Sequence, residues 1–117
     1  MNGMKLTDNR KPMVINPITE RRMKLSVAID NQLNHLVGED VKGGKWYWLS
    51  EDGCIYVEIR YGKTPLELKK GMYSIQCLDE SELITNLNTI KAMVLDGKFD
   101  NQLASISKSI RSNFMKK

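Results

Sequence analysis

The chain has 117 residues, of which 18 are Lys or Arg, 14 are Asp or Glu, one is His, two are Cys and 41% are hydrophobic. This size and composition fit one folded domain with its own core. They exclude a multi-histidine metal site and a structural zinc site, and no apolar run approaches the ~20 residues of a membrane span. We therefore expect neither a metal nor a cofactor. The N-terminal residues lack the apolar middle of a signal peptide, so we also expect a cytoplasmic protein.

The basic excess lies at the front of the chain. Residues 1–24 hold six basic and two acidic residues, whereas the remaining 93 residues hold twelve of each. Residues 1–15 show no periodicity, so we interpret them as a flexible basic arm before a single domain at 16–117. A second basic cluster lies within 108–117. Basic ends on a neutral body are typical of contact with nucleic acid, although they also serve solubility.

The first predicted helix covers residues 17–37. Asn16 is a typical N-cap and Pro17 suits the first helical position. Apolar residues then recur at helical spacing from Ile18 to Val37, as expected for a helix with one buried face. Gly38 is a typical C-terminal stop.

The middle of the chain predicts a four-stranded antiparallel meander. Asp52-Gly53 has the composition of a two-residue hairpin turn, and Gly62-Lys63 and Lys70-Gly71 are weaker reversals. Three two-residue turns together set a register that separates the side chains onto two faces. The apolar face holds Trp46, Trp48, Ile55, Val57, Ile59, Tyr61, Leu66, Leu68, Tyr73 and Ile75. The mostly polar face holds Lys45, Tyr47, Leu49, Glu51, Tyr56, Glu58, Arg60, Glu67, Lys69, Ser74 and Gln76.

The same register has two local consequences. It places Glu58 opposite Glu67, a like-charge pair that costs up to ~1 kcal/mol, so either a cation such as Arg60 or Lys69 lies nearby or the register is wrong there. It also places Cys54 and Cys77 on opposite faces, so we expect no disulfide between them.

Two helices are expected after the sheet. Asp79 and Glu82 match a capping box, with Leu78 and Leu83 as a hydrophobic staple, and Gly97 ends this helix. Its apolar stripe is Leu83, Leu87, Ile90 and Val94. Asp100 then caps a last helix whose stripe is Leu103, Ile106, Ile110 and Phe114.

The predicted fold is therefore α+β, with an N-terminal helix, a four-stranded antiparallel meander and two C-terminal helices packed on one sheet face. The helices are expected to cover the face that carries Trp46, Val57 and Leu68, so both tryptophans belong to the expected core.

The mostly polar sheet face is the candidate binding surface. Tyr47 and Tyr56 lie close across the predicted hairpin and are interleaved with Lys45, Arg60 and Lys69. Aromatic rings on which bases stack, combined with cations that neutralise phosphates, are typical of single-stranded nucleic-acid binding. An ordinary half-exposed antiparallel face would carry similar residues.

Cations of the N-terminal region would add phosphate contacts that do not depend on base sequence. The residues that we assign to this role are Arg10, Lys11, Arg21 and Arg22.

The sequence resembles a family of small uncharacterised proteins encoded by phages and mobile elements. The resemblance covers most of the chain and implies an accessory protein of unknown activity. The residues that carry it are Asn16-Pro17, Arg21-Arg22, Lys24-Leu25, Val57-x-Ile59-Arg60-Tyr61-Gly62, Leu66-Glu67-Leu68-x-Lys70-Gly71 and Gly97-Lys98-Phe99-Asp100.

The predicted architecture over about 45–96 also resembles the positive-cofactor/Whirly class of single-stranded-DNA-binding proteins. That class binds strands along curved sheets and dimerises through a C-terminal helix. The present chain departs from it by the long helix before the sheet and by the second helix after it.

The leading hypothesis is a small non-catalytic, phage-type protein that binds nucleic acid, with single-stranded DNA favoured. No nucleophile–base or acid–base pair is evident, so we do not expect an enzyme. The alternative is a protein–protein module that inhibits a host or defence enzyme, with Tyr47, Leu49 and Tyr56 as its interface. A homodimer through an edge strand or the last helix is left open.

Overall fold

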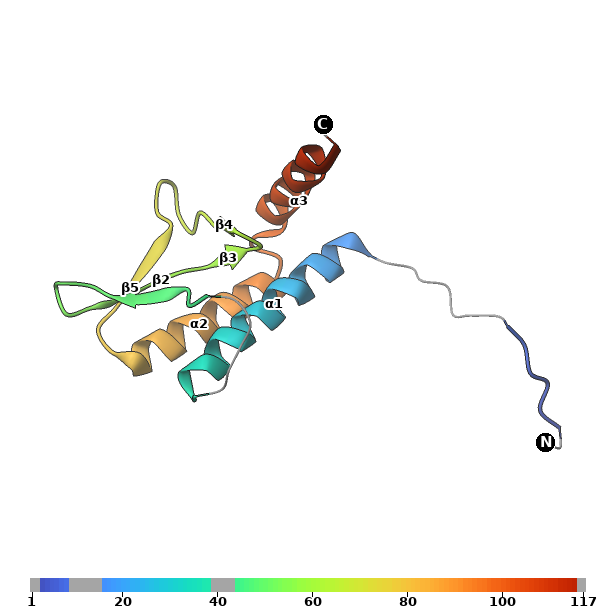
Figure 1. Cartoon of the computed structure of the whole chain (residues 1–117), viewed down its shortest axis with the longest axis horizontal. Helices are drawn as coiled ribbons and strands as arrows, with labels where there is room; N and C mark the ends of the chain where they lie inside the picture. The colour runs from blue at the N-terminus through green and yellow to red at the C-terminus, as the bar shows by residue number, and fades with distance from the viewer. Residues whose placement is uncertain (1–2, 9–15, 39–43, 116–117) are drawn as a thin grey trace.

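The computed structural model describes residues 3–8, 16–38 and 44–115, with side chains up to residue 110. The fold belongs to the α+β class, as predicted (Figure 1). No helix in the described part of the chain is both long enough and apolar enough to span a membrane. In chain order the elements are α1 (Pro17–Leu36), β1 (Tyr47–Leu49), β2 (Ile55–Glu58), β3 (Arg60–Tyr61), β4 (Thr64–Pro65), β5 (Ser74–Cys77), α2 (Glu80–Leu95) and α3 (Asp100–Met115).

Both ends of α1 follow the predicted signals. The Asn16 side chain accepts a hydrogen bond from the Ile18 backbone N–H at 3.0 Å, which satisfies one of the free donors of the first turn. The helix ends at Leu36, and Gly38 has a φ of +92°, a left-handed conformation that favours glycine.

The strands form two antiparallel sheets in place of one meander. The order in the larger sheet is β1-β2-β5, and β3 pairs with β4 in a separate two-stranded hairpin. The predicted two-residue turn at Gly62-Lys63 is confirmed, because Tyr61 lies opposite Thr64. The turn at Lys70-Gly71 is confirmed too, by the bridge between Lys69 and Met72.

A contact with α3 ends the β3–β4 hairpin early, and β5 instead of a longer β4 lies beside β2. The Gln102 side chain accepts from the Glu67 N–H at 2.5 Å and donates to the Glu67 carbonyl at 2.9 Å. Pairing along the hairpin therefore ends at Leu66, and Glu58 lies opposite Ser74. The predicted Glu58–Glu67 pair was wrong for this reason.

The β1–β2 hairpin differs from the prediction by one residue. Gly53, at φ +82°, donates to the Ser50 carbonyl at 3.0 Å, and the Ser50 N–H donates to Cys54 at 2.9 Å. The loop thus has three residues, with glycine in its left-handed position, and is not a two-residue turn. The extra residue shifts the register, so that Tyr47 lies opposite Val57 and Trp48 lies opposite Tyr56.

This shift reverses the faces of the β1 side chains, because alternate residues of a strand point to opposite sides. Tyr47 lies with the helix-covered side chains and packs against the core, whereas Trp48 is 44% exposed. The prediction that Trp48 belongs to the core was therefore wrong. Trp46 does pack against the core, as expected.

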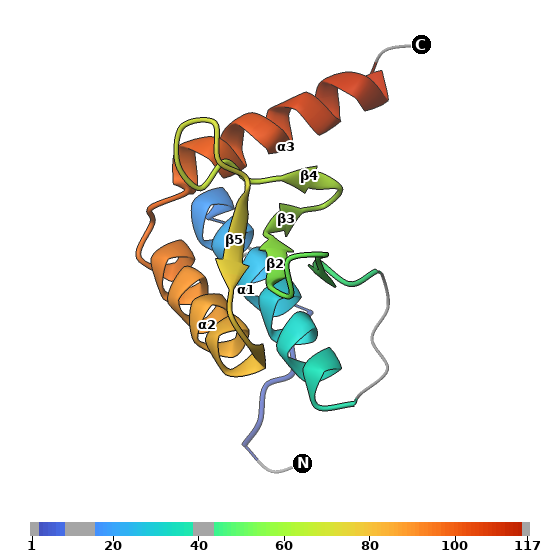
Figure 2. The ribbon, with the colours of Figure 1, turned by 90° about the vertical axis from the view of Figure 1, so that its left-hand side faces the viewer.

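The core lies between the sheet and the pair of helices α1 and α2, which run side by side (Figures 1 and 2). The predicted stripe of α2 is confirmed in full: Leu83, Leu87, Ile90 and Val94 are all buried. Asp79 caps this helix by accepting from the Glu82 N–H at 2.9 Å. Other members of the core are Leu25, Ile29, Val57, Ile59, Tyr61, Leu66, Cys77, Phe99 and Leu103.

Other local expectations had mixed outcomes. Leu78 is 68% exposed, so it does not form the expected staple. Cys54 and Cys77 are both free thiols, as predicted. The third helix packs against α1, and its C-terminal part points away from the sheet (Figures 1 and 2).

The buried face of α2 generates a first prediction. Replacing Leu87, which is fully buried, with alanine should lower the free energy of unfolding by about 2–5 kcal/mol, because it leaves a cavity in the core. Leu95→Ala on the same helix, where the side chain is 43% exposed, should change it by only about 0.5 kcal/mol. Urea unfolding measures both variants, and equal losses would contradict the orientation of α2.

The three-residue loop generates a second prediction. Gly53→Ala should destabilise the protein by about 1–2 kcal/mol, because an L-residue is strained at a φ of +82°. Gly44→Ala is the control, since Gly44 lacks a positive φ and has no atom near its Cβ position. Its expected effect is within about 0.5 kcal/mol. Thermal unfolding distinguishes the two, and a Gly53→Ala variant as stable as the wild type would contradict the left-handed conformation at Gly53.

Candidate nucleic-acid interface

The structure separates the two tyrosines of the predicted binding platform. Tyr47 is half-buried, its hydroxyl lies 2.9 Å from His35 Nδ1, and burial raises its pKa. Tyr56 lies on the outer sheet face, stacked on Trp48 with ring centroids 6.0 Å apart. The register places the two tyrosines on opposite faces, so one strand of nucleic acid cannot stack on both. Their predicted common platform was wrong, because it depended on the two-residue turn.

Two of the predicted phosphate-binding arginines are already paired. Arg22 donates from Nε to Asp100 at 2.8 Å and makes a second bond to the same carboxylate from its terminal nitrogen. Arg60 donates to Glu58 at 3.0 Å. The hydrogen bonds from Arg22 lower the pKa of Asp100, and those to Asp100 raise the pKa of Arg22. Arg22 thus joins α1 to α3.

The remaining predicted site residues are dispersed. Lys69 is exposed at the turn between β4 and β5. Lys45 lies with its ammonium 6.0 Å from the centroid of the Tyr47 ring. Arg10 and Lys11 lie outside the described residues. Arg21 alone among the predicted N-terminal cations is both described and unpaired with a described carboxylate.

Two cavities follow one face of α1. The larger, of about 680 Å³, lies between the first half of α1, Tyr61 and α3. The smaller, of about 350 Å³, lies between Asn31 and Gln32 of α1 and the segments around Trp46 and Gly62. The α1 residues that line them recur every three or four positions, as one face of a helix requires. We call these two cavities together the basic groove.

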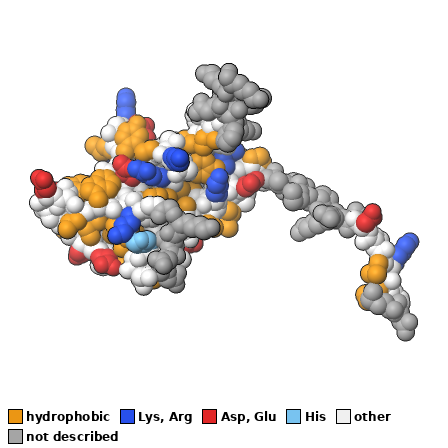
Figure 3. All heavy atoms as spheres, viewed as in Figure 1, with side chains coloured by type: hydrophobic (Ala, Val, Ile, Leu, Met, Phe, Trp, Pro, Cys, Tyr) orange, Lys and Arg blue, Asp and Glu red, His pale blue; other side chains and the backbone are white. Residues whose placement is uncertain are grey.

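Five cations line the basic groove without an ion pair to any carboxylate of the described residues. Figure 3 shows basic side chains in a band across this face, over α1 and the β3–β4 hairpin. Glu20 is the one acidic side chain among the residues that line the two cavities. The five cations are Arg21, Lys24 and Lys108 at the larger cavity, and Lys45 and Lys63 at the smaller one.

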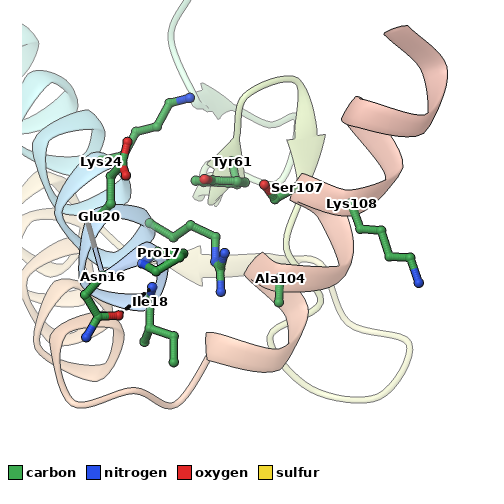
Figure 4. A pocket seen from close by; sticks show the side chains of 10 residues that line it. Asn16, Pro17, Ile18, Glu20, Lys24, Tyr61, Ala104, Ser107 and Lys108 are labelled. Carbon is green, nitrogen blue, oxygen red and sulfur yellow. Dashed lines mark hydrogen bonds between the residues drawn. The ribbon is translucent and has the colours of Figure 1, made fainter. Parts of the chain in front are cut away.

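The aromatic residue of the larger cavity is mostly covered. Tyr61 is 6% exposed, and burial raises its pKa. The Lys24 ammonium lies 5.5 Å from its ring centroid. In Figure 4, Ser107 lies beside the Tyr61 ring, and Lys108 points outward from α3. The groove therefore offers cations and hydrogen-bonding groups rather than an open stacking surface.

A buried glutamine holds one wall of the groove in place. Gln32, 4% exposed, donates to the Gly44 carbonyl at 3.1 Å and accepts from the Trp46 N–H at 2.9 Å. Lys45 lies between these two anchored residues, so its backbone is fixed against α1. The sequence signal for this role is a polar side chain on the buried face of a helix, where polar groups need partners.

Sequence reasoning did not assign Lys24, Lys63 and Lys108 to the site. Lys24 follows Arg21 at helical spacing, a usable signal for a shared face. Lys63 and Lys108 come from the β3–β4 turn and from α3, and no local pattern places them beside α1.

Comparison of the chain with protein-family models, curated proteins and solved structures gives no match. The described residues contain no group of three or more His, Cys, Asp or Glu side chains placed to hold a metal ion.

The Arg22–Asp100 pair generates a third prediction. Because the pKa of Asp100 is lowered in the folded protein, its contribution to stability is present above the ordinary pKa near 4. This contribution is lost as the pH falls through the lowered value. The difference in unfolding free energy between wild type and Asp100→Asn should thus be largest at pH 7 and shrink toward pH 2.

Urea unfolding across this pH range measures the difference. Glu51→Gln is the control, since Glu51 is an exposed carboxylate without an ion pair to a described residue. A difference for Asp100→Asn that stays constant from pH 7 to pH 2 would show that the ion pair is not the source of its effect.

Proposed function

We propose that the protein binds nucleic acid, with single-stranded DNA favoured, along the basic groove and without catalysis. The observation that carries the proposal is the set of five cations that line the two cavities along α1 without an ion pair to a described carboxylate. Like charges held close together raise the free energy of the folded protein, and a bound polyanion relieves this repulsion. Phosphates provide such a charge at each nucleotide and release counterions on binding.

The groove suits a strand that runs along α1. Arg21, Lys24 and Lys108 would contact phosphates at the larger cavity, and Lys45 and Lys63 would do so at the smaller one. Asn16 lines the larger cavity, so the preceding residues are attached at that end of the groove and could extend the phosphate contacts. The role of the aromatic side chains is then smaller than the sequence suggested.

The resemblance to small proteins of phages and mobile elements supplies a setting for this activity. An accessory protein that binds single strands needs affinity for phosphates and little preference for base sequence. Genes for replication or recombination beside its own gene would support this setting.

A second candidate function is a protein-interaction module, such as an inhibitor of a host or defence enzyme. The observation that favours it is the exposure of large apolar side chains at the β1–β2 hairpin, where Trp48 is 44% and Leu49 is 74% exposed. Exposed apolar groups of this kind mark interaction sites. Capture of a host protein that resists high salt would favour this function over nucleic-acid binding.

Fluorescence anisotropy with a labelled oligonucleotide tests the proposal and is the fourth prediction. A Lys24→Glu/Lys63→Glu variant should weaken binding at least about tenfold at low salt, since two phosphate contacts are lost and two repulsions are added. Lys24→Ala should lower the slope of log affinity against log salt by about 0.7 for a single strand.

The control is Lys70→Glu, which changes the charge at an exposed lysine of the β4–β5 turn, outside the groove. It should weaken binding far less than Lys24→Glu. Tyr56→Ala should leave binding unchanged, because Tyr56 lies on the other sheet face. Absence of binding at low salt, or equal effects of Lys70→Glu and Lys24→Glu, would contradict the proposal.

A further inference from the structure

The outer face of the larger sheet carries an exposed aromatic pair that the basic groove does not use. Trp48 lies opposite Tyr56, and their rings stack at 6.0 Å with planes 19° apart. Trp48 keeps 44% of its surface exposed. Apolar area left in water costs free energy, and a partner that covers it recovers that cost.

Acidic groups border this pair. Asp52 accepts hydrogen bonds from the Tyr56 hydroxyl at 2.5 Å and from the Cys54 N–H at 2.9 Å. These bonds lower the pKa of Asp52, and both donors are neutral, so the carboxylate keeps its full charge. Glu51 beside it is exposed and forms no ion pair with a described residue. We call Trp48, Tyr56, Glu51 and Asp52 the aromatic–acidic face.

Two cations lie near this face. Lys45 lines a small cavity together with Trp48 and Glu80. The closest basic residue along β2 and β3 is Arg60, and its charge is neutralised by Glu58 at 3.0 Å. The charged members of the face itself, Glu51 and Asp52, are acidic, whereas the basic groove is cationic, and Lys45 of the groove lines the cavity next to Trp48. A phosphate backbone would meet repulsion from Asp52 and Glu51, so the aromatic–acidic face does not suit nucleic acid.

We propose that the aromatic–acidic face binds a basic segment of another protein, with an arginine or lysine side chain over Trp48. Tryptophan is the aromatic side chain that attracts a cation most strongly, and nearby carboxylates add charge complementarity. A guanidinium also stacks flat on an aromatic ring while it donates to a carboxylate. The proposal rests on observations separate from those that support the groove.

Position in the sheet makes the face accessible. β1 is at the edge of the sheet order β1-β2-β5, so Trp48 can be approached without displacing a strand of the described sheet. The Asp52–Tyr56 hydrogen bond holds the Tyr56 ring against Trp48. Because the ring is already fixed, less conformational entropy is lost when a partner binds.

Two-dimensional NMR of the full chain offers a direct test, because each of the two tryptophans gives one indole N–H signal. The probe is a synthetic peptide of alternating glycine and arginine, and its matched control carries citrulline, a neutral analogue, in place of each arginine. We expect the arginine peptide to shift the Trp48 signal saturably and to leave the Trp46 signal in place. We expect the citrulline peptide to shift neither.

Charge variants test the acidic part of the face, with a labelled arginine peptide followed by anisotropy. Glu51→Gln and Asp52→Asn should each weaken binding by roughly two- to fivefold, and Trp48→Ala by at least about fivefold. The control Asp96→Asn removes a carboxylate that is 70% exposed and lies far along the chain at the end of α2. It should leave the affinity unchanged.

Other outcomes would overturn the proposal. Equal shifts with the citrulline peptide would show apolar contact without charge recognition, and unchanged affinity in Glu51→Gln would remove the acidic contribution. A Trp48 shift that grows with protein concentration alone would assign the face to a second copy of the chain, and a shift with an oligonucleotide would assign it to nucleic acid. One further outcome would support the proposal. If the Lys24→Glu/Lys63→Glu variant still binds the arginine peptide, the aromatic–acidic face binds its partner independently of the basic groove.

Discussion

The contact between Arg22 and Asp100 positions much of the candidate site. It joins the second turn of α1 to the first turn of α3 through two hydrogen bonds between a guanidinium and a carboxylate that lie 78 residues apart in the chain. Gly97 lies against the same guanidinium, where a Cβ atom would stand 2.7 Å from it, and its φ is +90°. With α3 anchored in this way, Lys108 lies about two turns along the helix and lines the same cavity as Lys24.

Pairing separates the structural cations of this protein from those available to a ligand. Arg22, Arg60 and Lys91 each meet a carboxylate within 3.0 Å, and two of these pairs link elements far apart in sequence. Arg60 also lines the smaller cavity, and the other five cations of the basic groove have no such partner in the described part of the chain. The exposed aromatic pair and its acidic neighbours belong to the β1–β2 hairpin and are not among the residues that line the two cavities of the groove.

Helices and turns were largely predictable, because their signals are local. Asn16 caps α1, Asp79 caps α2, and the apolar stripe of α2 is buried as expected. The hairpin register was not predictable, because Asp52-Gly53 suits a two-residue turn and also the end of a three-residue loop. The neighbouring residues do not distinguish the two-residue turn from the three-residue loop, because Tyr47 and Trp48 are each acceptable at a buried or at an exposed position.

The sequence by itself determined the α+β class, the helix boundaries, the positions of the turns and the buried face of α2. Each of these depends on residues within a few positions of one another, whose spacing and capping chemistry are visible in the chain. The tertiary structure alone decided that β5 lies beside β2 and which cations remain unpaired. Both outcomes depend on side chains distant in sequence, such as Gln102 on Glu67, and electrostatic interaction follows distance in space.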